Sequence, residues 1–430
     1  SDPQTRVQER LQKRLQKRLY FGLDGAYVRQ QIQLFNREQV SGVRPGDVAY
    51  RHIRLAKSAN GAAQLQWHPV RKSLSTARQS PGEVTLLDRQ GQVLWAGGQS
   101  SPSAVQAGLG PLMGEGDTSG HGLPAVLARA WAGQTVTAQL TLDPDWQRLL
   151  TQIVDCVGMQ GGKWDGQRCH AVAGVATPPA GRRAAMLLLD ADSGEILASS
   201  QTGPATRPLL GWQHDGGNFA SPGSTFKLVT ALALEQAASD HAAGVPAAGA
   251  PAALQARLAG LPLGELNQLG NKSGFRSDAA CYPMPCDGRQ PHVSNYRDHI
   301  LQGRAGDGRF GLAQALSGSM NTWFAWQAEA MDATLLGGAQ GGMPDLQPLQ
   351  VGALDAQRPL LAVSRQLGFE QALRLDGGWL PAGFTLQAGD VLQASVSRLE
   401  PVHSRHELRQ QAICLRMQTH VLQMAQVSAA

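Results

Sequence analysis

The sequence contains no run of eighteen apolar residues, so we expect no helix that spans a membrane. It also has no G-x-x-x-x-G-K-[ST] loop and no G-x-G-x-x-G after a strand, which argues against nucleotide binding. Aromatic residues make up 5% of the chain, and the net charge is only +5. No stripe of Lys and Arg is interleaved with aromatic residues, so we predict no nucleic-acid partner. A mildly basic surface would also suit an anionic polymer or an anionic membrane face.

Cysteine is scarce, with five residues in 430. Four of them fall in pairs within two loops: Cys156 with Cys169, and Cys281 with Cys286. Two loop-closing disulfides would fit an extracytoplasmic compartment and would leave Cys414 unpaired. The alternative is a zinc site that adds His170 or His292 as a ligand, but the paired C-x-x-C knuckles typical of such sites are absent.

The chain is organised around residues 222–227, which read Pro-Gly-Ser-Thr-Phe-Lys and precede an apolar run. Pro and Gly predict a tight turn, and the apolar spacing predicts a helix after it. We therefore expect Ser224 near a helix N-terminus, where free N–H groups favour developing negative charge. Lys227 follows one turn later and can take the serine proton if burial lowers its pKa. The alternative is an ordinary capped helix with a solvated lysine.

A second polar cluster is Ser319-Met320-Asn321, in a turn between two helices predicted within residues 310–325. A second hydroxyl close to Ser224 and Lys227 can relay a proton to a leaving amine. The Asn321 amide can hold both the lysine and a substrate backbone. The alternative is that Ser319 and Asn321 only cap a helix.

These two clusters resemble the Ser-x-x-Lys and Ser-x-Asn motifs of the penicillin-binding transpeptidases, which share the first motif with serine β-lactamases. The Thr-Leu-Asp…Gln segment at 141–147 and the Asp…Ser-Gly-Glu-Ile-Leu-Ala segment at 190–198 are both typical of the start of that domain. Residues 422–425, Leu-Gln-Met-Ala, resemble a helix that usually reads Thr-Pro-Leu-Gln-Met-Ala. His420 and Val421 stand where Thr-Pro is usual, which is a departure from the family.

The resemblance implies an α+β fold with two parts. Residues 135–430 would form the transpeptidase domain, a central and mainly antiparallel sheet flanked by helices. Residues 1–134 would form a smaller, strand-rich domain that serves as a pedestal or binds a partner. Within this part the apolar spacing predicts a basic helix over Thr5 to Tyr20, and short strands are predicted from Val43 to about Trp95.

The family's third motif, Lys-(Thr/Ser)-Gly on a strand after the Leu-Gln-Met helix, has no counterpart before Ala430. Lys272-Ser273-Gly274 lies between the first two motifs in a predicted loop, and we interpret it as coincidence. In the family the third motif supplies one oxyanion N–H, whose loss typically costs about two to three orders of magnitude in rate. We expect a chain truncated before this motif; the alternative is a degenerate homologue that cannot turn over.

The resemblance implies a monofunctional, class B-like peptidoglycan DD-transpeptidase that needs no cofactor or metal. Ser224 would attack a stem peptide, and β-lactams would acylate the same serine. Further partners would be other membrane proteins of cell-wall synthesis, and the protein would be anchored on the periplasmic face of the inner membrane. Two alternatives stay open: a DD-carboxypeptidase or serine β-lactamase, and a non-catalytic scaffold or β-lactam sensor.

Overall fold

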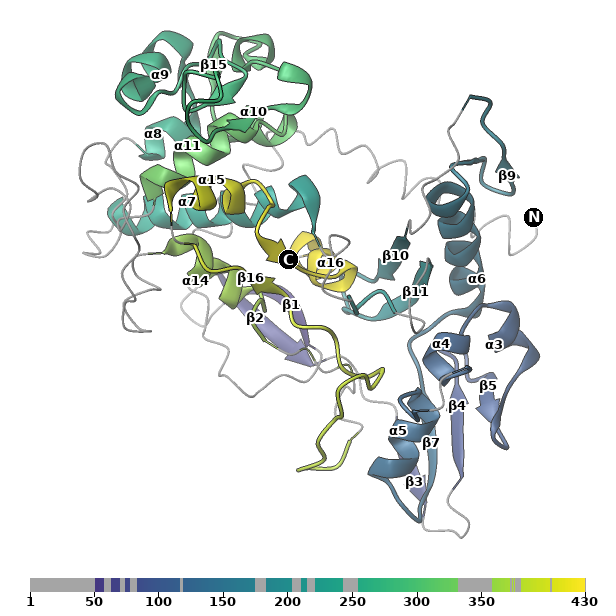
Figure 1. Ribbon diagram of the computed structural model, residues 1–430. Coiled ribbons are helices and arrows are strands. Elements are labelled where there is room, and N and C mark those ends of the chain that lie inside the picture. Colours follow the sequence, from purple (N-terminus) through teal and green to yellow (C-terminus); the bar gives the residue numbers. More distant parts are fainter. Residues whose placement is uncertain are drawn as a thin grey trace.

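The computed structural model describes most of the chain after residue 50. The described residues are 51–57, 63–69, 74–77, 83–116, 119–174, 183–202, 210–214, 221–242, 254–331, 358–371, 373, 375, 380–402 and 404–429. The basic helix predicted over Thr5 to Tyr20 lies outside them. The elements form a mixed α+β architecture, as predicted (Figure 1). Within the described ranges, no helix is both long and apolar enough to cross a bilayer.

The N-terminal part is built on a five-stranded sheet of order β3-β7-β4-β5-β6. Its strands are β3 Leu74–Ala77, β4 Val84–Leu87, β5 Val93–Ala96, β6 Gln99–Ser100 and β7 Thr135–Gln139. The Asp88 carboxylate accepts the N–H groups of Gln90 and Gln92 at 2.8 Å each, which closes the β4–β5 hairpin. The remaining strands of this region, β1 Arg51–Lys57 and β2 Ala63–Pro69, form a separate antiparallel pair.

Strand β7 belongs to the N-terminal sheet and not to the second domain, where we expected it. We expected Thr135–Gln139 to open the second domain, but it pairs antiparallel with β3 and parallel with β4. A division at residue 134 would therefore cut this sheet between its strands. The expectation failed because an alternating pattern predicts that a segment is a strand but does not identify the strands with which it pairs.

Three short helices pack with this sheet around one apolar core: α3 Pro102–Gln106, α4 Gly110–Met113 and α5 Leu123–Ala130. The same core takes in distant residues, among them Trp212 and Leu392. Asp390, which is fully buried, accepts hydrogen bonds at 3.0 Å from His121 and at 2.7 Å from Arg129. A late segment of the chain thus completes the core of an early one.

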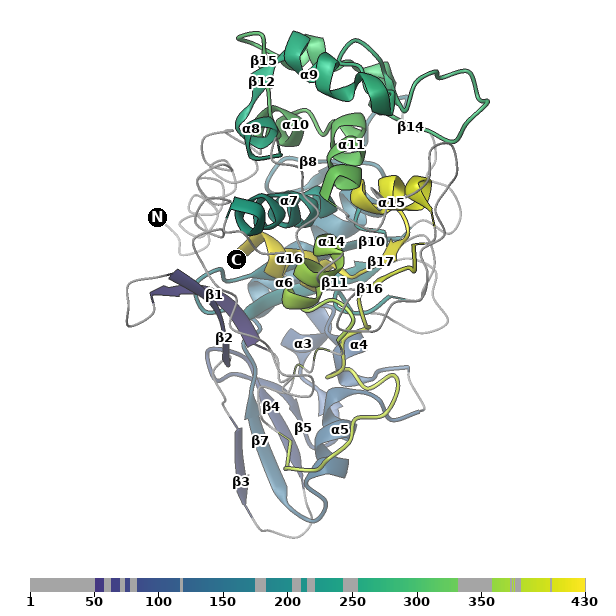
Figure 2. The same cartoon turned by 90° about the vertical axis from the view of Figure 1, so that its left-hand side faces the viewer.

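A two-stranded hairpin lies between helices in the larger part of the molecule (Figures 1 and 2). It consists of β10 Ala184–Leu189 and β11 Ile196–Thr202; α6 Pro144–Ile153 contacts β11, and α16 Val421–Ala429 contacts β10. The buried Gln147 amide fixes α6 by donating to the Ser199 carbonyl at 2.8 Å and accepting its N–H at 2.9 Å. We expected a central, mainly antiparallel sheet in this domain. Among the described residues, that sheet consists of the two strands β10 and β11.

A helical layer forms the second apolar core. Its helices are α7 Lys227–Ala242, α8 Leu254–Ala259, α9 Leu263–Gly270, α10 Leu312–Ser317, α11 Asn321–Met331, α14 Pro359–Gln366 and α15 Arg405–Ala412. Helix α7 contacts α8, α11 and α14 and is the central helix of this layer. Two-residue strands join the loops in pairs: β8 Lys163–Trp164 with β9 Cys169–His170, β12 Leu261–Pro262 with β15 Arg309–Phe310, β13 Cys281–Tyr282 with β14 Val293–Ser294, and β16 Arg398–Leu399 with β17 Met417–Gln418.

The cysteines form the two predicted disulfides, Cys156–Cys169 and Cys281–Cys286, and Cys414 is free. Cysteines joined in a disulfide carry no thiolate, which is the form that binds zinc. The Lys272-Ser273-Gly274 triplet lies in the single 3₁₀ turn Asn271–Ser273, and Gly274 ends the turn with φ of +81°. The triplet was predicted to lie in a loop and not on a strand, and the structure confirms this.

Candidate active site

Ser224 lies on a 3₁₀ turn, Gly223–Phe226, that runs directly into α7. Gly223 has φ of +60°, a backbone conformation that is unfavourable for residues other than glycine. Phe226 is fully buried and contacts Phe369 edge-on, so one side of the turn is held in the core. Ser224 on the other side is exposed, as a nucleophile must be. The predicted position at the start of a helix is therefore what the structure shows.

Lys227 brings the two predicted motifs together. Its Nζ donates to four oxygens: Ser224 Oγ at 3.1 Å, Ser319 Oγ at 2.9 Å, the Ser319 carbonyl at 2.8 Å and Asn321 Oδ1 at 2.5 Å. An ammonium carries three N–H groups, so these acceptors share them. The arrangement places a nitrogen within hydrogen-bond reach of both serine hydroxyls.

The surroundings of Lys227 favour the neutral amine. The side chain is 1% exposed, and its hydrogen-bond partners are all uncharged oxygens. Burial lowers the pKa of Lys227 from 10.5 to about 8, and the nearby Cys414 thiol opposes this shift weakly. At pH 7 about one amine in ten is then neutral, which is enough for a general base.

The second motif is held by its backbone and by a partner on another segment. Ser319 has φ of +50°, an uncommon conformation that turns the chain between α10 and α11. Met320 beside it is 1% exposed and anchors the turn. Asn321 donates from Nδ2 to the Ser294 carbonyl at 2.7 Å, so its Oδ1 must face Lys227. The motif is more than a helix cap.

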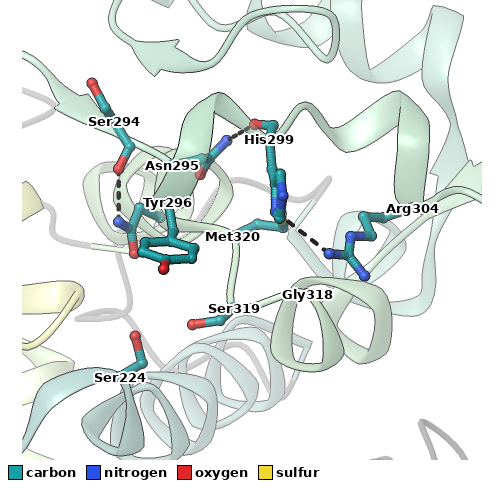
Figure 3. Close-up of a pocket in the computed structure, with 10 residues that line it drawn as sticks. Ser224, Ser294, Asn295, Tyr296, His299, Arg304, Gly318, Ser319 and Met320 are labelled. Atoms are coloured by element: carbon teal, nitrogen blue, oxygen red, sulfur yellow. Dashed lines mark hydrogen bonds between the residues drawn. The ribbon is translucent and has the colours of Figure 1, made fainter. Parts of the chain in front are cut away.

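Sequence reasoning missed the wall of the cleft opposite Ser224. A cavity of about 490 Å³ opens in front of Ser224, Ser319 and Asn321 (Figure 3). Its remaining wall comes from one irregular segment and carries Ser294, Asn295, Tyr296, His299 and Arg304. The segment shows no apolar period, because its conformation depends on single hydrogen bonds to distant residues rather than on a regular element.

A second cavity of about 390 Å³ lies on the other side of the Ser224 turn, at Thr225. It is lined by His214 and His420, whose rings stack 6.5 Å apart. Burial, with a smaller contribution from the nearby His214, lowers the pKa of His420 from 6.5 to about 3. His420 stands where the resemblance led us to expect Thr, so this departure places a buried, neutral imidazole in the cavity beside the Ser224 turn.

No family model matches the sequence, and no curated protein matches it. Several solved structures are similar to the chain. Penicillin-binding protein 2 of Pseudomonas aeruginosa, in complex with WCK 5153, is 16% identical with a TM-score of 0.41 and covers 81% of this chain and 68% of its own. Penicillin-binding protein A from M. tuberculosis, a ceftriaxone acyl-enzyme complex, is 17% identical with a TM-score of 0.34. The match covers 93% of this chain and 70% of that chain. A peptidoglycan synthase complex is 17% identical with a TM-score of 0.37, and the match covers 83% of this chain and 70% of that chain. At this level of similarity, the function is inferred from the geometry around Ser224.

Proposed function

We propose that the chain is a serine-type DD-transpeptidase that cross-links the stem peptides of peptidoglycan through an acyl-enzyme on Ser224. The observation that carries this proposal is the position of Lys227 Nζ, which lies within 3.1 Å of both serine hydroxyls in a buried site. A hydroxyl next to a buried amine is a nucleophile next to a base. No histidine belongs to this cluster, and the second hydroxyl gives the proton a path to a leaving group.

In the acylation step the neutral Lys227 amine takes the Ser224 proton while Oγ attacks the carbonyl carbon of the penultimate D-alanine. A tetrahedral intermediate forms, and the bond from that carbon to the nitrogen of the terminal D-alanine then breaks. The proton on Lys227 reaches this nitrogen through Ser319, whose Oγ is 2.9 Å from Nζ. Free D-alanine leaves, and the ester on Ser224 remains.

In the second step the amine of another stem peptide attacks the ester. It loses one proton to Lys227, an amide bond forms, and Ser224 Oγ leaves and recovers its proton. A β-lactam would follow the acylation step alone, because its ring nitrogen remains tethered after the C–N bond opens. Asn321, fixed by Ser294, is placed to hold the donor's backbone along the cleft.

The proposed location is extracytoplasmic, on the periplasmic face of the inner membrane. The two disulfides support it, since such bonds persist in oxidising compartments. Partners among other cell-wall synthesis proteins in the membrane belong to the same proposal. A carboxypeptidase or β-lactamase would share the acylation step and differ only in using water as the acceptor.

Incubation with a fluorescent penicillin tests the proposal directly. We expect one adduct per chain, mapped by peptide mass to Ser224, and none on a Ser224→Ala variant. Ser221→Ala is the matched control, since Ser221 lies two residues before that turn and its hydroxyl donates to the Cys414 carbonyl at 3.2 Å. A folded wild-type chain that gains no adduct would reject acyl transfer and leave the scaffold alternative. Adding an amine acceptor, and measuring ester loss against water alone, then separates transpeptidation from hydrolysis.

The rate of this labelling should depend on pH in one direction. Because the neutral amine is the active form, the rate rises about tenfold per pH unit below the Lys227 pKa of about 8 and levels off above it. Second-order labelling rates between pH 6 and 9.5 give this profile. A rate that falls with rising pH across this range would mean that the protonated lysine is required, contrary to its role as a base.

A further inference from the structure

In the described part of the chain, the far wall of the Ser224 cavity carries an arginine without a matching acid. Arg304 and the half-buried His299 line it, and none of the described residues that line it is Asp or Glu. Arg304 Nη2 lies 3.4 Å from His299 Nδ1, so the imidazole accepts from the guanidinium. Across the described part of the chain, Arg304 makes no salt bridge with a carboxylate. Figure 3 shows Ser224 on one side of this cavity and His299 with Arg304 on the other.

This wall is held in place by a buried amide. Asn295 is 5% exposed; its Nδ2 donates to the His299 carbonyl at 2.8 Å, and its Oδ1 accepts the N–H of Thr322 on α11 at 3.0 Å. Helix α11 begins at Asn321, so the wall is fixed to the helix that carries the second motif. The wall therefore has a defined place relative to the nucleophile.

The loop between these anchors has an unfavourable backbone. Arg297 and Asp298 both have positive φ, at +51° and +55°. Such conformations are unfavourable for residues other than glycine and persist where the surroundings enforce them, often at ligand sites. The result is an exposed Tyr296 ring, 69% accessible, that stacks under the Arg297 guanidinium at 5.0 Å and meets the His299 ring edge-on at 6.4 Å. An aromatic surface and the Arg304 guanidinium thus line the same cavity.

We propose that Arg304 binds a carboxylate on the acyl donor, in the part of the donor that lies along Tyr296 beyond the reacting carbonyl. The guanidinium offers paired N–H groups that match a carboxylate, and the missing acid would come from the substrate. Donors with a free carboxylate at this position are preferred over those with an amide. This inference rests on the proposed acylation of Ser224 and adds the substrate class of that site.

The test compares two penicillins that differ by one side-chain carboxylate, carbenicillin and benzylpenicillin. Their second-order rates of Ser224 acylation are measured by intact mass and by competition with a fluorescent penicillin. We expect Arg304→Gln to lower the carbenicillin-to-benzylpenicillin rate ratio by about tenfold or more, since charge-assisted hydrogen bonds are worth that much. Arg304→Lys should recover part of the ratio. Arg289→Gln, an exposed arginine that does not line the cavity, is the matched control and should leave the ratio unchanged.

A rate ratio in Arg304→Gln within about twofold of the wild-type value would overturn the inference, because a structural role would slow both penicillins equally. Adduct formation with benzylpenicillin in that case would leave the proposed acyl transfer intact. Failure of both penicillins to acylate the folded wild-type chain would instead reject the proposed function, and the inference with it.

Discussion

Replacing Lys227 with methionine should slow penicillin labelling of Ser224 by about three orders of magnitude, within the range found for general bases. Methionine fills a similar volume but cannot take the serine proton. The fold should survive, because the substitution removes a buried, partly charged amine and keeps the packing against Phe324, whose ring centroid lies 5.8 Å from Nζ. Labelling kinetics give the rate, and thermal unfolding gives the stability.

Lys272→Met is the matched control. Lys272 is the exposed lysine of the Lys-Ser-Gly triplet in the 3₁₀ turn, and this change should leave the labelling rate within about twofold of wild type. Equal losses in the two variants would indicate that this triplet takes part in the chemistry after all. A normal rate in Lys227→Met would show that some other group is the base.

The second large effect should be on stability, at Glu329. Its carboxylate accepts from Arg409 Nε at 2.6 Å and from the Tyr282 hydroxyl at 2.5 Å, which ties α11 to α15 and β13. The Glu329 and Arg409 side chains are only 12% and 11% exposed. Glu329→Gln leaves the arginine buried without its counter-charge, and we expect the free energy of unfolding to fall by about 3 kcal/mol. Urea unfolding followed by circular dichroism measures it.

Two further variants define the cause of that loss. Glu265→Gln removes an exposed carboxylate on α9 and should change stability by less than about 0.5 kcal/mol. The double variant Glu329→Leu with Arg409→Met removes both charges and should recover much of the loss, because apolar pairs often replace buried ion pairs without cost. If the double variant is less stable than Glu329→Gln, the hydrogen-bond geometry rather than the charge balance holds these elements.

Both halves of the Ser224 and Ser319 cluster were predictable because each is a local signal. The Pro-Gly turn and apolar run at Ser224, and the turn at Ser319, are read from a few neighbouring residues. The structure adds that Lys227 reaches across to Asn321, at 2.5 Å. Local motifs name the groups, and tertiary packing brings them together.

The cleft wall was beyond such reasoning. Asn295, Tyr296 and Arg304 lie in a stretch without a helical or strand period, and its shape depends on bonds such as that between Asn295 and Thr322. The same limit applies to Thr135–Gln139. Its alternating burial identifies a strand, but only the register with β3 and β4 shows that it belongs to the N-terminal sheet.

The buried Asp390 bears on the order in which the protein is made. During synthesis the strands and helices around His121 and Arg129 leave the ribosome long before residue 390, their partner. Until then the apolar face that later meets Leu392 and Leu422 stays uncovered. Nascent chains with such surfaces associate readily and engage chaperones. The early sheet is therefore exposed to misassembly until translation has passed residue 390.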